Sequence, residues 1–244
     1  MEISRRKILI GGVGVSLLPA NSLATTAQTN EGGHVVLLGD SIFDNKVYVG
    51  KEPAVIDQLK EVLGTKWQAT LLAVDGHITR DIGQQLRKLP ATATHLIVSV
   101  GGNDALMNQG ILSEQVKSST EVFQKLADLQ SEFGRQYENM LDQVLKANKP
   151  VAVCTIYDPN FDEAIQNQLS IAALSVFNDR ITRAAFSLGI PVIDLRLLFR
   201  GPQDYANPIE PGPVGGQKIA EQIHKIVTTH DFSKQRSSIY PGAR

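Results

Sequence analysis

From His34 onward, the chain alternates short apolar runs with longer segments in which apolar residues recur at helical spacing. The short runs are rich in Val, Ile and Leu, as expected of strands that are buried on both faces of a parallel sheet. They span residues 34–39, 67–74, 95–101, 150–157 and 190–195. Because such alternation is typical of a parallel sheet covered by helices, the pattern predicts an α/β fold.

The intervening segments predict helices at residues 53–63, 79–89, 113–147, 163–188 and 214–229. Pro53 suits a first helical turn, and Gly64 suits a helix end. Residues 107–110 are predicted to form a loop after the third strand, and residues 231–244 a flexible polar tail. No internal repeat or linker interrupts the alternation, so one domain is expected over residues 34–230.

Residues 1–27 have the layout of an export signal. Arg5 and Arg6 precede a short apolar stretch, which is followed by small polar residues. The adjacent arginines resemble the twin-arginine signal that moves folded proteins across the bacterial inner membrane. We therefore expect the export machinery to bind this leader and the mature protein to be periplasmic or extracellular. Cleavage is expected after Ala24 or Ala27, and an uncleaved membrane anchor is the alternative.

Charge and cysteine content exclude several classes of function. The chain has 24 Lys and Arg residues against 25 Asp and Glu residues, a formal net charge of -1, and no long run of one sign. This balance argues against nucleic acid as a partner. Cys154 is the single cysteine, so neither a disulfide framework nor a cysteine-based metal site can form. No His pair has metal-ligand spacing, and we expect no metal and no cofactor.

The candidate functional residues directly follow the predicted strands. In open parallel sheets, ligands bind beyond the carboxyl ends of the strands. Ser41 comes after the first strand and a Gly-Asp turn. A hydroxyl exposed there can attack a carbonyl group once a base removes its proton. The simpler interpretation of this triplet is a turn that closes the strand. Asp44 and Asn45 follow closely and could orient the loop of the nucleophile, but a solvated turn is the simpler interpretation of both.

Two further strand ends supply what acyl transfer requires. Gly76 follows the second strand, and Asn103 follows the third. A backbone amide at glycine and an Asn side chain donate hydrogen bonds without carrying charge, which suits an oxyanion hole. Asp158 follows the fourth strand at the same edge of the sheet and is expected to shape a substrate pocket.

Three blocks together resemble the GDSL/SGNH hydrolases: GDSIFDN at residues 39–45, Gly76 in VDGHIT, and GGND at residues 101–104. Their order after successive strands matches that family, and the similarity covers residues 34–229. The resemblance implies a flavodoxin-like three-layer α/β/α sandwich with five parallel strands in the order 2-1-3-4-5. It also implies ester hydrolysis without a metal, through an acyl-enzyme on Ser41, with the Ser41 amide, Gly76 and Asn103 forming the oxyanion hole.

The chain departs from the family in its last block. The family has an Asp, two residues and then the catalytic His, whereas this chain has Asn-Pro-Ile-Glu at residues 207–210. Glu210 is one candidate for the base, provided that its surroundings raise its pKa above the ordinary value of about 4.3. His77, next to Gly76, is a second candidate for the base.

A third interpretation is a non-catalytic carbohydrate or acyl-group binding protein that keeps the pocket. In that case Glu210 is simply a favourable charge near the amino end of the last helix. We favour hydrolysis, because the serine, the glycine and the asparagine of the motif are all present together. The expected substrate is an acyl or acetyl ester of a small molecule, a glycan or a lipid.

Overall fold

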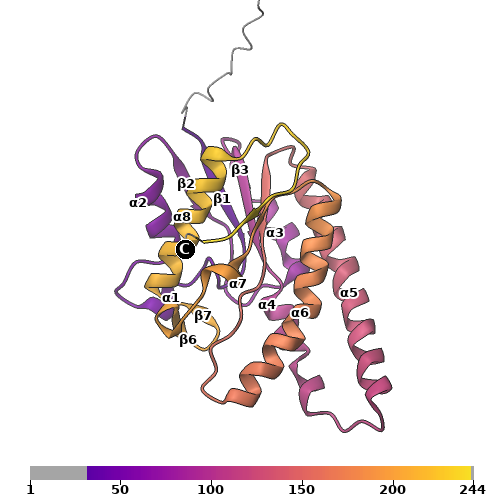
Figure 1. Cartoon of the computed structure of the whole chain (residues 1–244). Helices are drawn as coiled ribbons and strands as arrows, with labels where there is room; N and C mark the ends of the chain where they lie inside the picture. Colours follow the sequence, from indigo (N-terminus) through magenta and orange to yellow (C-terminus); the bar gives the residue numbers. More distant parts are fainter. Residues whose placement is uncertain (1–31, 243–244) are drawn as a thin grey trace, which may run out of the picture. The chain divides into compact units, whose positions relative to one another are not determined.

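Short runs of Val, Ile and Leu form the central sheet, as the pattern predicts. In the computed structural model, which describes residues 32–242, the sheet has six strands: β1 (His34–Gly39), β2 (Gln68–Leu71), β3 (His95–Ser99), β4 (Val151–Cys154), β5 (Val192–Ile193) and β8 (Ile239–Tyr240) (Figure 1). All are parallel and lie in the order β2-β1-β3-β4-β5-β8. The expected α/β class and the expected order of the first five strands are confirmed.

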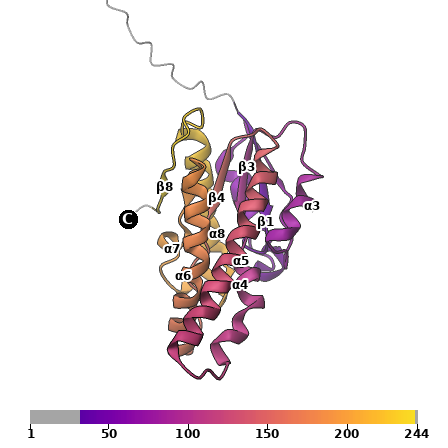
Figure 2. The same ribbon diagram turned by 90° about the vertical axis from the view of Figure 1, so that its right-hand side faces the viewer.

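Helices cover both faces of this sheet and give three layers (Figures 1 and 2). The α-helices are α1 (Lys46–Val49), α2 (Val55–Leu63), α3 (Ile82–Leu86), α4 (Gly102–Met107), α5 (Ser119–Leu145), α6 (Ala164–Ser187), α7 (Leu195–Leu198) and α8 (Pro213–Thr229). Successive side chains in a strand point to opposite faces. Val35 and Leu37 of β1 therefore pack in the core under α2 and α8, whereas Val36 and Leu38 pack under α3, α5 and α6.

Two of the predicted boundaries differ from the structure. The helix expected at residues 113–147 begins only at Ser119, because the Ser118 hydroxyl caps it by accepting a hydrogen bond from the Glu121 amide at 3.3 Å. The loop expected at residues 107–110 is instead the end of α4 followed by a 3-10 helix. The remaining short elements are the 3-10 helices η1 (Thr79–Asp81), η2 (Gln109–Ser113) and η3 (Pro202–Asp204) and the antiparallel hairpin of β6 (Tyr205–Asn207) and β7 (Glu210–Pro211).

The sixth strand corrects the expected count of five. Ile239 and Tyr240 of β8 pair in parallel with Val192 and Ile193 of β5. The Tyr240 hydroxyl is also hydrogen-bonded to Nδ1 of His230, with 2.9 Å between the two atoms. A strand of two residues inside a polar segment is too short to produce an apolar run, so the hydrophobic pattern does not reveal it.

The amino-terminal halves of α5 and α6 extend beyond the sheet. The two helices have 27 and 24 residues, which correspond to about 40 and 36 Å at 1.5 Å per residue. The longest strand has only six residues, or about 20 Å. Each helix ends close to the start of the strand that follows it, so the excess length projects past the carboxyl edge of the sheet (Figures 1 and 2). This projection forms a wall beside that edge.

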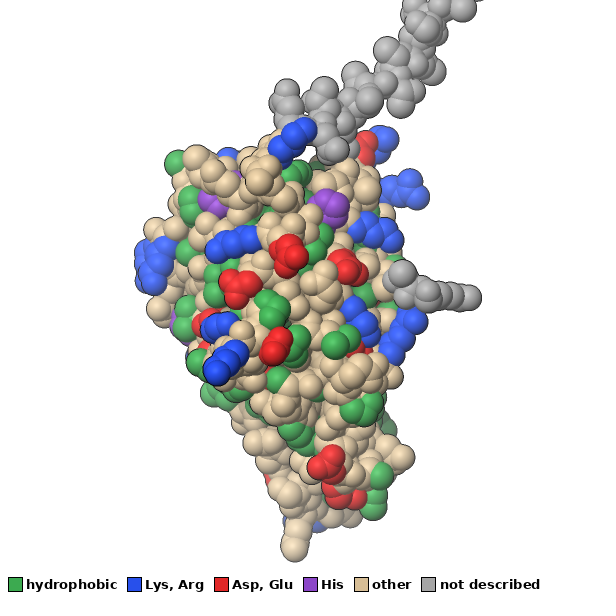
Figure 3. All heavy atoms as spheres, turned by 90° about the vertical axis from the view of Figure 1, so that its left-hand side faces the viewer, with side chains coloured by type: hydrophobic (Ala, Val, Ile, Leu, Met, Phe, Trp, Pro, Cys, Tyr) green, Lys and Arg blue, Asp and Glu red, His purple; other side chains and the backbone are tan. Residues whose placement is uncertain are grey.

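Figure 3 shows the face on the left-hand side of Figure 1, where basic and acidic side chains are interspersed. Among residues 32–242, no helix is both long enough and apolar enough to cross a lipid bilayer. The predicted export signal at residues 1–27 lies outside the described residues, and export therefore stays a prediction.

Gly39, the last residue of β1, is expected to be essential for stability. It has a φ of 142°, and a Cβ atom there would lie 1.8 Å from the Ser99 carbonyl oxygen of β3. Overpacking costs about 1–3 kcal/mol, and a strained φ costs about 1–3 kcal/mol more. We expect Gly39→Ala to lower the melting temperature, measured by circular dichroism, by about 5–20 °C. Gly110→Ala is the control, because a Cβ there has no neighbour within 4 Å; equal melting temperatures would contradict the prediction.

Candidate active site

Ser41 lies in the turn that follows β1. The amides of Phe43 and Asp44 donate to the Asp40 carbonyl at 3.1 and 3.0 Å and close this turn. The Asp40 carboxyl group accepts a further hydrogen bond from the Ile42 amide at 3.1 Å. Ser41 itself is only 7% exposed. The predicted turn therefore forms, and it holds the Ser41 side chain in a fixed and largely dry position at the carboxyl edge of the sheet.

Gln85 of α3 fixes the end of β1. Its side-chain oxygen accepts from the Gly39 amide at 2.8 Å, and its Nε2 donates to the Gly39 carbonyl at 2.7 Å. The same Nε2 lies 3.0 Å from Nδ1 of His77, in the loop after β2. Gln85 is buried, so it ties the strand that carries Ser41 to the loop that carries Gly76 and His77.

The Ser41 hydroxyl donates a hydrogen bond to Oε1 of Glu210, with 3.0 Å between the two oxygens. Glu210 is the first residue of β7 and is 6% exposed. The two residues lie 169 positions apart in the sequence. They meet because the β6–β7 hairpin, which precedes α8, lies against α1. Helix α1 is the element that follows the Ser41 turn in the chain. The first of the two candidate bases is therefore the one in contact with Ser41.

The backbone on either side of Glu210 is held by buried side chains. The Tyr157 hydroxyl donates to the Ile209 carbonyl at 2.6 Å. Nδ2 of Asn45 donates to the Pro211 carbonyl at 3.0 Å. Asn45 is in turn fixed by the Val55 amide of α2, which donates to its Oδ1 at 2.9 Å. The carboxyl group of Glu210 thus has a fixed direction toward Ser41, and no third group among residues 32–242 is hydrogen-bonded to it.

Burial changes the acidity of Glu210. Loss of contact with water raises the pKa of its carboxyl group from 4.5 to about 7, the hydrogen bond from Ser41 lowers it, and the negative charge of Asp75 raises it. A carboxylate with a pKa near neutrality is a stronger proton acceptor than an ordinary one and is still partly ionised at neutral pH. The structure thus provides the surroundings that a Glu base requires.

Asp40 is a second buried carboxyl group beside the same pocket. It is 1% exposed, and its Oδ2 has no hydrogen-bond partner among the described residues. Burial raises the pKa of Asp40 to about 8, the Ile42 amide lowers it, and the charges of Glu210 and Asp104 raise it. At neutral pH Asp40 is therefore mostly protonated, and Glu210 is the carboxyl group that ionises next to Ser41.

The expected oxyanion donors lie in the neighbouring loops. Within residues 32–242, the amides of Ser41 and Gly76 donate to no protein acceptor. Gly76 is exposed and has a φ of 79°. Nδ2 of Asn103, at the start of α4, donates to the His77 carbonyl at 2.9 Å, which leaves its second hydrogen available because an amide nitrogen carries two. Asp104 accepts from the Thr79 amide and hydroxyl, both at 3.0 Å, and fixes these loops to each other.

The other predicted site residues, His77 and Asp158, make no hydrogen bond to the Ser41 side chain. The His77 ring contacts Gln85, and the Ser41 hydroxyl bonds to Glu210 and not to His77. Asp158 follows β4 as expected, and its carbonyl accepts from the Tyr205 hydroxyl at 2.5 Å. Its neighbours Tyr157 and Pro159 line the pocket, whereas Asp158 does not. Among the described residues, His, Cys, Asp and Glu form no group of three that would hold a metal ion.

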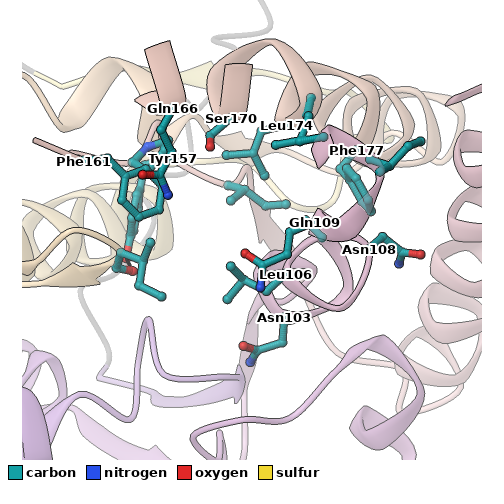
Figure 4. A pocket seen from close by; sticks show the side chains of 18 of the residues that line it. Asn103, Leu106, Asn108, Gln109, Tyr157, Phe161, Gln166, Ser170, Leu174 and Phe177 are labelled. Atoms are coloured by element: carbon teal, nitrogen blue, oxygen red, sulfur yellow. Dashed lines mark hydrogen bonds between the residues drawn. The ribbon is translucent and has the colours of Figure 1, made fainter. Parts of the chain in front are cut away.

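A pocket of about 370 Å³ opens beside Ser41 and Glu210. It lies between α4 and η2 on one side and the projecting halves of α5 and α6 on the other, and Asn103 is part of its lining (Figure 4). Gly76, His77 and Asp158 are not part of that lining. The structure therefore brings Ser41, Asn103 and Glu210 together around one cavity, and it places the remaining three residues in adjoining loops.

Residues 37–218 match the sequence profile of the GDSL-like lipase/acylhydrolase family, a span that includes all the predicted site residues. The match covers well over half of the chain. The chain belongs to this family. Membership supports ester hydrolysis as the class of reaction. A search of curated proteins gave no match.

Solved structures show the same fold as this GDSL-family protein. A lipase from the goat rumen metagenome is 20% identical, with a TM-score of 0.60 and coverage of 81% of this chain and 98% of that one. The extracellular lipase of Streptomyces rimosus is 17% identical, with a TM-score of 0.57 and coverage of 81% and 100%. An acetyl xylan esterase is 17% identical, with a TM-score of 0.56 and coverage of 80% and 99%. At such identities the likeness shows the fold, and it leaves the substrate of the GDSL-family chain to be argued from its own pocket.

Several contributors to this GDSL-family site are not apparent in the sequence. Asn45 is completely buried and supports the Glu210 hairpin, so the solvated turn that we expected there is wrong for this residue. The segment at residues 107–110 carries pocket-lining residues and is helical. The proximity of Asn45 to the serine motif was the only available signal for its role. For the α4–η2 wall, the alternation of apolar and polar residues is too irregular to predict an element.

The raised pKa of Asp40 predicts a specific dependence of stability on pH. The unfolded chain releases this proton near pH 3.8, whereas the native protein keeps it until about pH 8. Between these values the native state binds more protons, so the contribution of Asp40 to the free energy of unfolding falls as pH rises. Asp40→Asn keeps the acceptor for the Ile42 amide and removes the titration. We expect wild type to lose stability relative to Asp40→Asn by up to about 1.4 kcal/mol per pH unit, measured by urea denaturation; parallel pH curves would contradict this.

Proposed function

We propose that the protein is a serine ester hydrolase in which Glu210 acts directly as the base for Ser41. The observation that carries this proposal is the 3.0 Å hydrogen bond from the Ser41 hydroxyl to the buried Glu210 carboxylate. A nucleophile and a base within hydrogen-bonding distance, beside a pocket that can hold the ester, are the minimum for acyl transfer. The raised pKa of Glu210, about 7, supports the assignment because it brings the basicity of the carboxylate to the working range of an enzyme.

In the first half of the reaction, Oγ of Ser41 attacks the carbonyl carbon of the ester while Glu210 takes the hydroxyl proton. The carbonyl oxygen becomes an oxyanion, which is to be stabilised by the amides of Ser41 and Gly76 and the side chain of Asn103. The tetrahedral intermediate then expels the alkoxide of the alcohol, which receives the proton from Glu210. The product of this half is an ester between the acyl group and Ser41.

In the second half, water attacks the acyl carbon and Glu210 takes a proton from that water. The intermediate breaks down by releasing Oγ of Ser41, which recovers its proton from Glu210, and the acid leaves. The carboxyl group thus returns to its ionised state after each cycle. Because Asp40 is mostly protonated at neutral pH, it adds little negative charge that would oppose the oxyanion.

A Glu base has a different structural requirement from a histidine base. In the usual triad a third, acidic residue orients the imidazole ring. Here Tyr157 and Asn45 fix the main chain on both sides of Glu210, so that the hairpin itself sets the direction of the carboxylate. The site therefore supports a two-residue mechanism whose orientation comes from backbone anchoring.

The test is hydrolysis of p-nitrophenyl esters by wild type and three variants over a range of pH. Ser41→Ala is expected to reduce turnover to background, and Glu210→Gln to lower kcat by about 10²–10⁴, because Gln has a similar shape but accepts no proton. His77→Ala is expected to keep most of the activity. For wild type, kcat/KM should rise with pH around a midpoint near 7, since the base must be ionised to act.

The outcomes separate the three interpretations of the site. Loss of activity in His77→Ala together with retention in Glu210→Gln would make the histidine the base. Absence of any Ser41-dependent turnover in the folded wild-type protein would favour a binding protein. Circular dichroism of each variant establishes that it is folded.

Tyr157→Phe tests whether the anchoring of the hairpin matters for catalysis. The change removes the hydrogen bond to the Ile209 carbonyl next to Glu210. Tyr240→Phe is the matched control, because the hydroxyl of this β8 residue bonds to the His230 ring, outside the hairpin and outside the pocket lining. Each variant is expected to lose about 1 kcal/mol of stability, measured by urea denaturation. Only Tyr157→Phe is expected to lower kcat, by several-fold; an equal fall in both variants would assign the effect to stability alone.

A further inference from the structure

The pocket beside Ser41 continues well beyond the reacting atoms. Its far wall comes from the parts of α5 and α6 that project past the sheet, and η2 closes the opposite side (Figures 2 and 4). An acetyl group would occupy only the part next to Ser41. The reaction at Ser41 alone does not account for the remaining volume of the pocket.

The face of α6 that lines the pocket changes from polar to apolar along its length. Gln166, Ser170, Leu174 and Phe177 lie at helical spacing on this face, and Figure 4 shows them along one wall. Gln166 is exposed, Ser170 and Leu174 are half-buried, and Phe177 is 3% exposed. The distance along the helix from first to last is about 16 Å. The cavity thus has a polar mouth and an apolar interior.

The apolar interior is completed by residues from the other elements. These are Leu106 of α4, Ile111 of η2, Leu126 and Leu129 of α5, and Ile156 after β4. Among residues 32–242, Asp40 and Glu210 are the only acidic residues in the lining, and no Lys or Arg contributes to it. A phosphate or carboxylate on the substrate would find no positive partner here and would meet two carboxyl groups. The lining therefore favours an uncharged, apolar group.

We propose that this cavity binds the acyl chain of the substrate and that the chain is an uncharged aliphatic acyl group of medium length, from hexanoyl to decanoyl. The volume of about 370 Å³ holds on the order of ten groups the size of a water molecule, each of which occupies about 30 Å³ in the liquid. A methylene group is of similar size. This inference rests on the proposed function, since it takes Ser41 as the point at which the acyl group is attached.

The test is a chain-length series of p-nitrophenyl esters from acetate to dodecanoate, each below the concentration at which it aggregates. Burial of each added CH₂ group is expected to raise kcat/KM by up to about fourfold until the chain fills the cavity, after which the value falls. An ester whose hexanoyl chain ends in a carboxylate is expected to react far more slowly than the hexanoate. Highest kcat/KM for the acetate would overturn the proposal.

Two variants shorten the cavity. Leu174→Trp and Ser170→Trp place an indole ring inside it, and using both guards against failure of one to fold. Each is expected to lower the ratio of kcat/KM for octanoate to that for acetate by at least tenfold. Leu169→Trp is the matched control, because Leu169 lies on the same helix, is 45% exposed and is not part of the lining. An unchanged ratio in folded Leu174→Trp and Ser170→Trp would also overturn the proposal.

A binding measurement distinguishes failure of this inference from failure of the proposed function. If no ester shows Ser41-dependent hydrolysis, the proposed function fails while the cavity is still open to test. Titration calorimetry with methyl hexyl ketone, an uncharged probe, is expected to show binding to Ser41→Ala, weaker binding to Ser170→Trp, and none with acetone. Equal heats for the two ketones would reject the acyl-chain site whatever the protein hydrolyses.

Discussion

The hydrogen bond between the Ser41 hydroxyl and the Glu210 carboxylate joins a segment near the start of the domain's sequence to one near its end, at a buried point. A carboxylate that is nearly out of contact with water is costly, and the cost appears as a pKa raised to about 7. The hydrogen bond from the Ser41 hydroxyl reduces this cost. The rest of the fold holds the hydroxyl in position. The Ser41 turn, the Glu210 hairpin and the side chains that anchor them are all arranged around this contact. The second carboxylate oxygen of Glu210 is buried and has no protein partner among the described residues, which adds to the cost of ionising the group.

The fold explains why these residues meet. In a parallel sheet with the order β2-β1-β3, connections leave β1 and β3 on opposite sides, and a crevice opens at the carboxyl ends of these two strands. Ser41 follows β1, and Asn103 follows β3, so both lie at this crevice. Glu210 arrives from a hairpin outside the sheet. Its position is therefore set by hydrogen bonds from Tyr157 and Asn45 and not by strand pairing in the main sheet.

Much of this arrangement can be predicted from the sequence, because strand ends and motif blocks have local signals. The Ser41 turn and the position of Asn103 follow from motifs at the ends of Val- and Ile-rich runs. The strand order and the candidacy of Glu210 follow from the resemblance to the GDSL/SGNH hydrolases. Asn45 and β8 show where local signals fail. Asn45 looks like any polar turn residue, and its burial depends on α2 and the hairpin closing over it. The two residues of β8 acquire their strand conformation only by pairing with β5.

The pocket is the part of the site that depends most on tertiary structure. Its apolar wall consists of residues on α5 and α6 whose spacing indicates only that one helix face is apolar, as a core face would be. Some apolar residues of α5 and α6 line the pocket instead of forming core because both helices are longer than the strands that they cover. Along the sheet their apolar side chains form core, and beyond its edge the same helical pattern has no sheet to pack against. Leu126, Leu129 and Leu174 lie toward this second region and remain only half-buried, although Leu129 and Leu174 still pack on one side against the core. An apolar surface that the fold leaves uncovered beside a nucleophile is best covered by the substrate itself, and this physical requirement favours an acyl chain over an acetyl group.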